Sequence, residues 1–348
     1  MKALVWHGRR DVRYEEVPDP GLPGPGEVAV RVAYAGICGT DLEEYTDGPI
    51  FVPVEAVHPL TGRKAPLILG HEFSGIVEMV GEGVENLQVG DPVAADTLLY
   101  CGTCPECRQG RHNLCENLAS LGQMADGGLA ERVVAPAYTF VKLPPELPLD
   151  LAALAEPLAV AVRGVRRAEL CPGDHVLIMG AGTIGLMALL VARDAGAASV
   201  TVIEPRPSRA LLARDMGADE VQASWDDLSG TVRFDRALEC TGKAPVQQAA
   251  LRLLRPQGRL VLVGIPTDGT WFDTMDIVNF EREVVGSLSH LAEEDFRQAV
   301  DMLGSKRVDV APFISRRYPL SRGVEAFTLL ERGEDDILKI LMSPNEDL

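Results

Sequence analysis

The stretch VLIMGAGTIG at residues 176–185 runs from four apolar residues directly into three glycines with the spacing G-x-G-x-x-G. The apolar run predicts a buried β-strand, and the apolar residues after the last glycine predict a helix. Gly180 allows the tight turn, Gly182 lets backbone amides approach a pyrophosphate at the helix N-terminus, and Gly185 permits close packing of helix on strand. The context therefore predicts a dinucleotide-binding βα unit.

Further apolar segments surround this unit and extend the pattern of alternating strands and helices. Besides residues 175–179, buried strands are expected at 199–204, 220–223, 236–239, 259–263 and 284–289, with helical stretches between most of them. Strands that alternate with helices pair in parallel and are covered on both faces. Residues 156–294 are therefore predicted to form a Rossmann domain of α/β class, with a doubly wound parallel sheet of six strands.

An acidic residue decides which dinucleotide is expected. Glu204 ends the next strand, twenty-four residues after Gly180, where a carboxylate can bind both ribose hydroxyls and repel a 2'-phosphate. NAD is therefore favoured, although Arg206 and Arg209 follow closely and can accept the 2'-phosphate of NADP. The residues expected to contact the cofactor are Gly180, Gly182, Thr183, Ile184, Gly185, Glu204 and Arg209.

The first part of the chain has a different pattern. Short β-branched segments separated by Gly, Pro and Asp occur at residues 27–34, 73–80, 91–95 and 129–134, which predicts a β-rich, barrel-like domain over residues 1–155. After residue 289 the sequence offers two helix-like runs and one strand-like run, which are too few for a separate domain. Residues 295–348 are therefore expected to return to the first domain.

Four of the seven cysteines form a compact motif. Cys101, Cys104, Cys107 and Cys115 have the spacing C-x2-C-x2-C-x7-C. Four thiolates close a tetrahedron around zinc and leave no open position for substrate, so a structural zinc is expected. An iron–sulfur cluster is the alternative, and the absence of the continuing C-x3-C-P pattern disfavours it. Metal-binding cysteines must stay reduced, and disulfides form mainly in exported proteins, so this motif favours a cytoplasmic location.

Composition excludes several classes of partner. The formal net charge of −18 over 348 residues argues against binding nucleic acid or an anionic membrane, because both favour clustered Lys and Arg. No apolar run approaches the ~20 residues of a membrane span, and the N-terminal residues show no signal peptide. Neither nucleic acid nor a membrane is therefore expected as a partner.

A second set of possible metal ligands is scattered along the first half of the chain. Cys38 belongs to the string CGTD, His71 and Glu72 belong to the string GHE, and Glu156 stands just before a proline at the start of the second domain. A mixed set of three or four S, N and O ligands with one water is typical of a catalytic zinc. Each residue alone is more often a packing or turn residue, so the prediction depends on their occurrence together.

These motifs resemble, over essentially the whole chain, the zinc-dependent medium-chain alcohol dehydrogenases, and within them the (R,R)-2,3-butanediol and sorbitol dehydrogenase branch. The GHE and cysteine motifs carry the resemblance to the superfamily, and the segment between Cys38 and His71 favours the butanediol type. The resembling strings are CGTD at 38–41, EYTDGPIF at 44–51, HPLTGRKAP at 58–66, GHEFSG at 70–75, DGG at 126–128 and EPLAV at 156–160.

The resemblance implies a GroES-like catalytic domain with two zinc ions per chain, one catalytic and one structural. Cys38 and His71 would bind the catalytic zinc, and Glu156 stands where relatives place a third ligand or a water-holding carboxylate. Glu72 is the alternative ligand, which would exchange with the water. A homodimer or homotetramer is implied in the same way.

The resemblance also assigns roles in proton transfer. Thr40 would take the alcohol proton and pass it toward the ribose hydroxyls, and Asp41 would orient the His71 ring. Relatives often carry His at the positions of Glu43 and Arg163 in this chain. The sequence therefore does not predict the route by which the proton reaches solvent.

The implied substrate is a secondary alcohol and its ketone, with a vicinal diol such as 2,3-butanediol and the hydroxyketone acetoin favoured. The segment 44–66 would narrow the pocket around such a diol, or else cover a domain surface or a subunit contact. Sorbitol-type and threonine-type dehydrogenases share every zinc motif and are the alternatives. A non-catalytic, cofactor-binding relative is a remote one, because it does not account for Cys38, His71 and Glu156 together.

Overall fold

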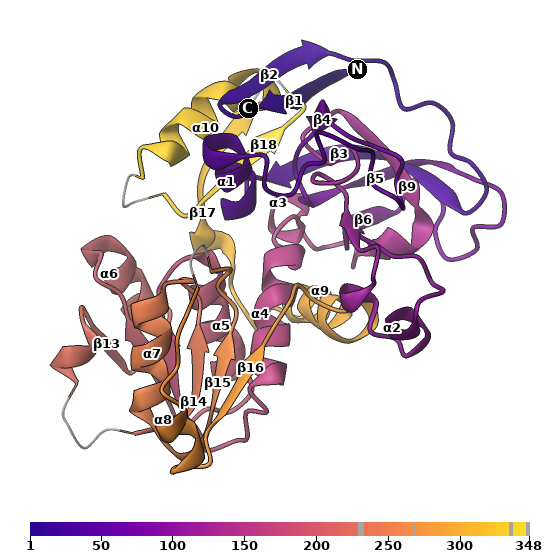
Figure 1. Cartoon of the computed structure of the whole chain (residues 1–348). Helices are drawn as coiled ribbons and strands as arrows, with labels where there is room; N and C mark the ends of the chain where they lie inside the picture. Colours follow the sequence, from indigo (N-terminus) through magenta and orange to yellow (C-terminus); the bar gives the residue numbers. More distant parts are fainter. Residues whose placement is uncertain (229–232, 267–268, 334–336, 346–348) are drawn as a thin grey trace. The chain divides into compact units, whose positions relative to one another are not determined.

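The computed structural model describes residues 1–228, 233–266, 269–333 and 337–345, and the chain divides into two compact units (Figure 1). The first unit comprises Met1–Glu156 and Leu291–Leu348, and the second comprises Pro157–His290. The sequence analysis placed the boundaries between the domains at 155/156 and 294/295. In the structure, Glu156 and residues 291–294 belong to the first unit. Among the described residues, no helix is both long and apolar enough to cross a membrane.

The second unit is built on one parallel sheet of six strands, which confirms the predicted Rossmann architecture. In spatial order its strands are β13 (Glu220–Gln222), β12 (Ser199–Ile203), β11 (His175–Met179), β14 (Phe234–Glu239), β15 (Leu254–Leu262) and β16 (Glu283–Gly286), and every neighbouring pair is parallel. The helices are α4 (Ala155–Arg167), which begins in the first unit, and α5 (Thr183–Asp194), α6 (Pro207–Asp215), α7 (Ala244–Leu253) and α8 (Thr274–Val278).

The strand order explains where this sheet presents a ligand site. From β11 the chain first adds strands on one side of the sheet (β12, β13) and then on the other (β14, β15, β16), so the strand order reverses between β11 and β14. In open α/β sheets, ligands bind at the carboxyl ends of the strands at such a point. β11 lies at the centre, and the apolar side chains of Val176–Met179 are fully buried. Burial on both faces is the reason that this strand reads as a continuous apolar run.

The described residues of the first unit form three sheets, which are mostly antiparallel. A seven-stranded sheet has the path β10 (Phe140–Lys142), β6 (Pro92–Ala95), β5 (Glu72–Val80), β3 (Glu27–Gly36), β18 (Lys339–Ser343) and β17 (Ile314–Pro319), with β9 (Arg132–Pro136) also paired to β3. Smaller sheets are β2 (Asp11–Glu16), β1 (Lys2–Gly8) and β4 (Leu67–Ile68), and the pair β7 (Leu98–Leu99) and β8 (Ala119–Ser120). The helices are α1 (Gly39–Asp47), α2 (Pro105–Arg108), α3 (Leu149–Ala152), α9 (Arg297–Gly304) and α10 (Gly323–Glu331).

The C-terminal segment is part of this first unit. β18 pairs antiparallel with β3 and parallel with β17, so the end of the chain continues the seven-stranded sheet. The ring of Tyr45 on α1 lies 5.3 Å from the ring of Phe327 on α10, and both side chains are buried. The sequence analysis did not predict β17, because its exposed Arg316 and Arg317 interrupt the apolar pattern.

Candidate active site and metal-binding groups

Cys38 is held at the start of α1 by an acidic side chain. Its backbone N–H donates to Asp41 Oδ2 at 2.9 Å, which closes the first turn of the helix. Asp41 is only 1% exposed, and its other oxygen, Oδ1, lies 3.5 Å from Nδ1 of His71. One carboxylate therefore faces both Cys38 and His71, the orienting position predicted for it.

His71 follows a glycine that the packing requires. Gly70 has a φ of +93°, and a Cβ there would lie 2.6 Å from the Leu129 side chain. The His71 ring is buried, with Nδ1 toward Asp41 and Nε2 3.4 Å from Thr40 Oγ1. Burial alone lowers the pKa of His71, but Asp41 and Cys38 outweigh it and raise the pKa well above its usual range.

Cys38, His71 and Glu72 form a group that suits a divalent metal. One ligand atom from each lies within 4.8 Å of the others. The sulfur, imidazole nitrogen and carboxylate oxygen are the ligand types that zinc takes in catalytic sites. Asp41 and Cys38, which raise the pKa of His71, also favour a bound cation at this place, so these residues fit a metal ion.

Glu72 has a partner that the sequence analysis did not find. Both of its oxygens accept from Lys339 Nζ, at 2.8 and 2.7 Å, and Nζ also donates to the carbonyl of Ile37 at 3.1 Å. Glu72 is fully buried and Lys339 is 2% exposed. Burial lowers the pKa of Lys339, but Glu72 outweighs it and raises the pKa. Glu72 is thus an ion-paired carboxylate in the described structure rather than a free one.

Glu156 lies at the start of α4 and is 8% exposed. It is not a member of the group in which Cys38, His71 and Glu72 share a 4.8 Å neighbourhood. The structure therefore places Glu72 nearer to the other two ligands than Glu156, and the choice between the two carboxylates remains a prediction.

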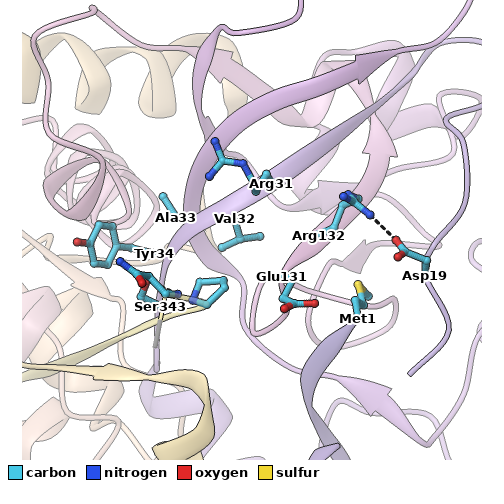
Figure 2. Close-up of a pocket in the computed structure, with 11 residues that line it drawn as sticks. Met1, Asp19, Arg31, Val32, Ala33, Tyr34, Glu131, Arg132 and Ser343 are labelled. Carbon is cyan, nitrogen blue, oxygen red and sulfur yellow. Dashed lines mark hydrogen bonds and ion pairs between the residues drawn. The ribbon is translucent and has the colours of Figure 1, made fainter. Parts of the chain in front are cut away.

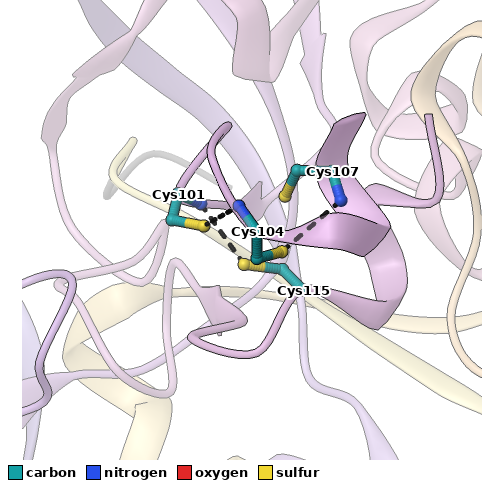
Figure 3. A group of neighbouring side chains, drawn as sticks. All are labelled: Cys101, Cys104, Cys107 and Cys115. Atoms are coloured by element: carbon teal, nitrogen blue, oxygen red, sulfur yellow. Dashed lines mark hydrogen bonds between the residues drawn. The ribbon is translucent and has the colours of Figure 1, made fainter. Parts of the chain in front are cut away.

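The four cysteines of the second motif lie together around α2, as Figure 3 shows, and their sulfurs are within 4.8 Å of one another. Tetrahedral zinc with bonds of ~2.3 Å needs sulfurs about 3.8 Å apart, so the group fits that ion. Backbone N–H groups donate to these sulfurs, including Cys104 N to Cys101 Sγ at 3.4 Å. The backbone N–H of Thr103 is the main reason that the pKa of Cys101 falls to about 6.

The glycine turn after β11 has the shape expected of a dinucleotide site. Gly180 has a φ of +96°, and a Cβ on Gly185 would lie 1.9 Å from the carbonyl oxygen of Gly180. Gly182 is the N-cap of α5, which begins at Thr183 and continues through Ile184. The N-terminus of this helix is therefore a site suited to an anion.

Glu204 stands beside that turn at the end of β12. It is 6% exposed, and its Oε2 accepts from the backbone N–H of Ala181 at 2.7 Å, while Oε1 accepts from Arg206 N at 2.9 Å. A Cβ on Gly182 would lie 4.0 Å from Arg209 Nη1, so a guanidinium also reaches the turn. The structure brings the predicted acidic and basic cofactor residues to the same turn.

A separate cavity of about 580 Å³ lies beside β3 in the first unit (Figure 2). Arg31, Tyr34, Glu131 and Arg132 are among the residues that line it, and none of the predicted site residues does. Arg132 bonds Asp19 at 2.6 Å, and Glu131 accepts from the backbone N–H of Lys2. Its charged side chains are thus engaged with the protein itself, and the cavity is not the candidate active site.

The sequence also gave no sign of Gln123, whose amide nitrogen donates to Thr40 Oγ1 at 3.4 Å. A single Gln in a loop carries no motif, and Lys339 lies 267 residues from its partner in the chain. The pairing of β18 with β3 is the feature that brings Lys339 to Glu72, and only the fold reveals it.

Comparison with known proteins agrees with this geometry. Residues 24–145 match the family model of the alcohol dehydrogenase GroES-like domain, and residues 183–305 match that of the zinc-binding dehydrogenases. The (R,R)-butanediol dehydrogenase of Bacillus subtilis is 36% identical over 99% of this chain and 100% of its own length. A sorbitol dehydrogenase of Macaca fascicularis is 33% identical over 99% of this chain and 96% of its own length.

A solved structure gives the same result. The crystal structure of 2R,3R-butanediol dehydrogenase from Bacillus subtilis has a TM-score of 0.91 and 34% identity, and the match covers 99% of both chains. The sequence resemblance, the two matched domains and the two metal-binding groups therefore agree, and the chain belongs to the zinc-dependent medium-chain alcohol dehydrogenase family.

Proposed function

We propose that this enzyme interconverts a secondary alcohol and its ketone with NAD, and that its substrates are a vicinal diol such as 2,3-butanediol and the hydroxyketone acetoin. The observation that carries the proposal is the likeness to butanediol dehydrogenase over 99% of the chain. The Cys38–His71–Glu72 group, with Thr40 beside it, supplies the site that such chemistry needs.

The metal-binding residues divide into two sets in this proposal. Cys38 and His71 hold the catalytic zinc, with Glu156 as a third ligand or water-holding carboxylate or Glu72 as the alternative ligand that exchanges with the water. The four cysteines hold the structural zinc. A catalytic zinc is a Lewis acid that lets an alcohol lose its proton near neutral pH. The Thr40 hydroxyl accepts that proton and passes it toward the cofactor ribose, while Asp41 keeps the His71 ring in place.

NAD is the proposed cofactor because Glu204 stands beside the glycine turn. Replacing Glu204→Gln keeps an oxygen for the Ala181 N–H, removes the charge that repels a 2'-phosphate, and also removes the acceptor of the Arg206 N–H. We expect kcat/KM for NADP, relative to NAD, to rise about tenfold, which corresponds to about 1.4 kcal/mol. Equal use of NAD and NADP by the unchanged enzyme would contradict the assignment, and Arg209→Ala should lower the NADP activity of the variant.

The segment 44–66 is anchored to the first unit at both ends. Glu44 is 2% exposed, and its carboxylate accepts from the backbone N–H groups of Ile50, Phe51 and Val52, the shortest bond being 2.7 Å. At the far end, Thr61 Oγ1 donates to the carbonyl of Met124 at 2.6 Å. Both ends of the segment are thus tied to the unit that carries Cys38 and His71.

A polyol is the second candidate, because sorbitol dehydrogenase is nearly as similar as butanediol dehydrogenase. A screen of NAD reduction across 2,3-butanediol, sorbitol, threonine, ethanol and 2-butanol decides between them. We expect 2,3-butanediol to have the highest kcat/KM, with about 1 to 3 kcal/mol for each well-placed contact. A clear preference for sorbitol, threonine or ethanol would reject the diol assignment and leave the zinc chemistry in place.

We also propose that the enzyme is a cytoplasmic homodimer or homotetramer. The two cysteine-containing metal groups need reduced thiols, which favours the cytoplasm. β16 is an edge strand of the second unit's sheet. The residues that precede it in the sequence include three exposed apolar side chains, Trp271, Met275 and Val278. Exposed apolar residues next to an edge strand are a feature of subunit contacts, and light scattering would measure the assembly.

A further inference from the structure

Gln123 lies in a turn whose position relative to His71 is set by backbone packing. Gly122 has a φ of +86°, and a Cβ on it would lie 2.5 Å from the carbonyl group of Gly70. A Cβ on Gly127 would lie 2.3 Å from the same carbonyl oxygen, and Gly128 N donates to it at 2.8 Å. The turn therefore rests directly on the residue that precedes His71.

The side chain of Gln123 is directed to the candidate metal site. Its Nε2 is 3.4 Å from Thr40 Oγ1, which is itself 3.4 Å from His71 Nε2. The amide is thus two hydrogen-bond lengths from a proposed metal ligand. Gln123 is half-buried, and within the described part of the chain the bond to Thr40 is the one hydrogen bond of its side chain. A second amide hydrogen and the amide oxygen are therefore available to a ligand.

We propose that Gln123 is a specificity-determining residue that hydrogen-bonds the second, non-reacting oxygen of a vicinal substrate. This inference rests on the proposed function, and it names the group that would distinguish a diol from a simple alcohol. An amide both accepts and donates, so it can bind a hydroxyl through Oε1 or a carbonyl through Nε2. The non-reacting oxygen is a hydroxyl when 2,3-butanediol is oxidised and a carbonyl when the diketone diacetyl is reduced.

The same turn explains how the segment 44–66 acts on selectivity. Thr61 donates to the carbonyl of Met124, the residue after Gln123. Arg63 forms an ion pair with Asp126, which also accepts from the backbone N–H of Ile68 at 3.1 Å. The segment therefore braces the Gln123 turn, so it contributes to diol selectivity through that turn even where it does not touch substrate.

The test compares two substrates that differ by one oxygen. For Gln123→Leu we expect kcat/KM for 2,3-butanediol to fall about 10- to 100-fold, while the value for 2-butanol changes less than about threefold. Gln248→Leu is the matched control, since Gln248 is also half-buried, and its Nε2 donates to the backbone oxygen of Trp271 in the second unit. It should leave both values unchanged.

Binding supplies a readout that does not depend on turnover. In the enzyme–NADH complex neither alcohol can react, so NADH fluorescence reports the Kd of each. Gln123→Leu should raise the Kd of 2,3-butanediol by about the factor by which it lowers kcat/KM for that diol, and it should leave the Kd of 2-butanol unchanged. Gln123→Glu, which accepts but cannot donate, should impair diacetyl reduction more than butanediol oxidation.

The outcomes separate the inference from the proposed function. If the unchanged enzyme prefers 2,3-butanediol over 2-butanol and Gln123→Leu keeps that preference, the inference is wrong and the function stands. Equal losses on both alcohols would mean that Gln123 only positions Thr40, which also overturns the inference. If the unchanged enzyme does not distinguish the two alcohols, the vicinal-substrate assignment fails, and the role of Gln123 fails with it.

Discussion

The two metal-binding groups of the first unit are built in opposite ways. The four cysteines lie within fifteen residues, and backbone N–H groups of the same loop donate to their sulfurs. Cys38 comes from one segment and the neighbours His71 and Glu72 from another, and the side chains of Asp41, Thr40 and Lys339 surround them. A closed group is encoded locally, whereas an open one depends on how the sheets assemble. The first stabilises a fold, and the second leaves room for chemistry.

Removing a ligand of the open group should have the largest effect. We expect His71→Ala to lower kcat by at least about 1000-fold, because zinc supplies several kcal/mol of charge stabilisation in such reactions. Metal analysis of the same variant should show one zinc per chain where the unchanged enzyme has two. Retained activity, or a variant that still holds two zinc ions, would remove His71 from the ligand set.

Lys339 provides the next test, since it contacts the open group through its ion pair with Glu72 and its hydrogen bond to the carbonyl of Ile37. Lys339→Met should lower the free energy of unfolding by about 3 to 5 kcal/mol, because it leaves a buried carboxylate without its cation. Chemical denaturation measures this value. The double variant Lys339→Met/Glu72→Gln removes both charges and should recover much of the loss. A single variant as stable as the unchanged enzyme would show that the pair does not form as described.

Asp41 should have a smaller effect, confined to the chemistry. Asp41→Asn keeps an oxygen for the backbone N–H of Cys38 and puts an NH2 group in place of the acceptor that faces His71. Loss of such an orienting partner typically costs 10- to 100-fold in metal affinity or activity, and we expect a fall in kcat/KM of about that size. Asp150 forms an ion pair with Arg317 in the same unit, and Asp150→Asn is the control, which should leave kcat/KM unchanged. A silent Asp41→Asn would reject the orienting role.

The contrast between the two groups also explains what could be predicted from the sequence. The cysteine spacing and the glycine turn are local patterns, and the structure brings each set together at the predicted place. The open group needed several weak motifs at once, and Lys339 and Gln123 could not be found at all. Lys339 reaches Glu72 because β18 joins the sheet beside β3, and Gln123 reaches Thr40 because its turn rests on Gly70. Contacts of this kind depend on which distant segments pack together in the fold, and no repeating pattern in the sequence predicts them.

Graded removal of metal tests the central claim most directly. Zinc content, NAD reduction and the unfolding midpoint are followed together as a chelator is added to the unchanged enzyme. We predict two zinc ions per chain, of which the open site loses its ion first, so that activity disappears while the fold and one zinc remain. Cys104→Ser should instead destabilise the protein before it affects chemistry. A single zinc per chain, or loss of both ions together with unfolding before activity falls, would contradict the division into one open and one closed site.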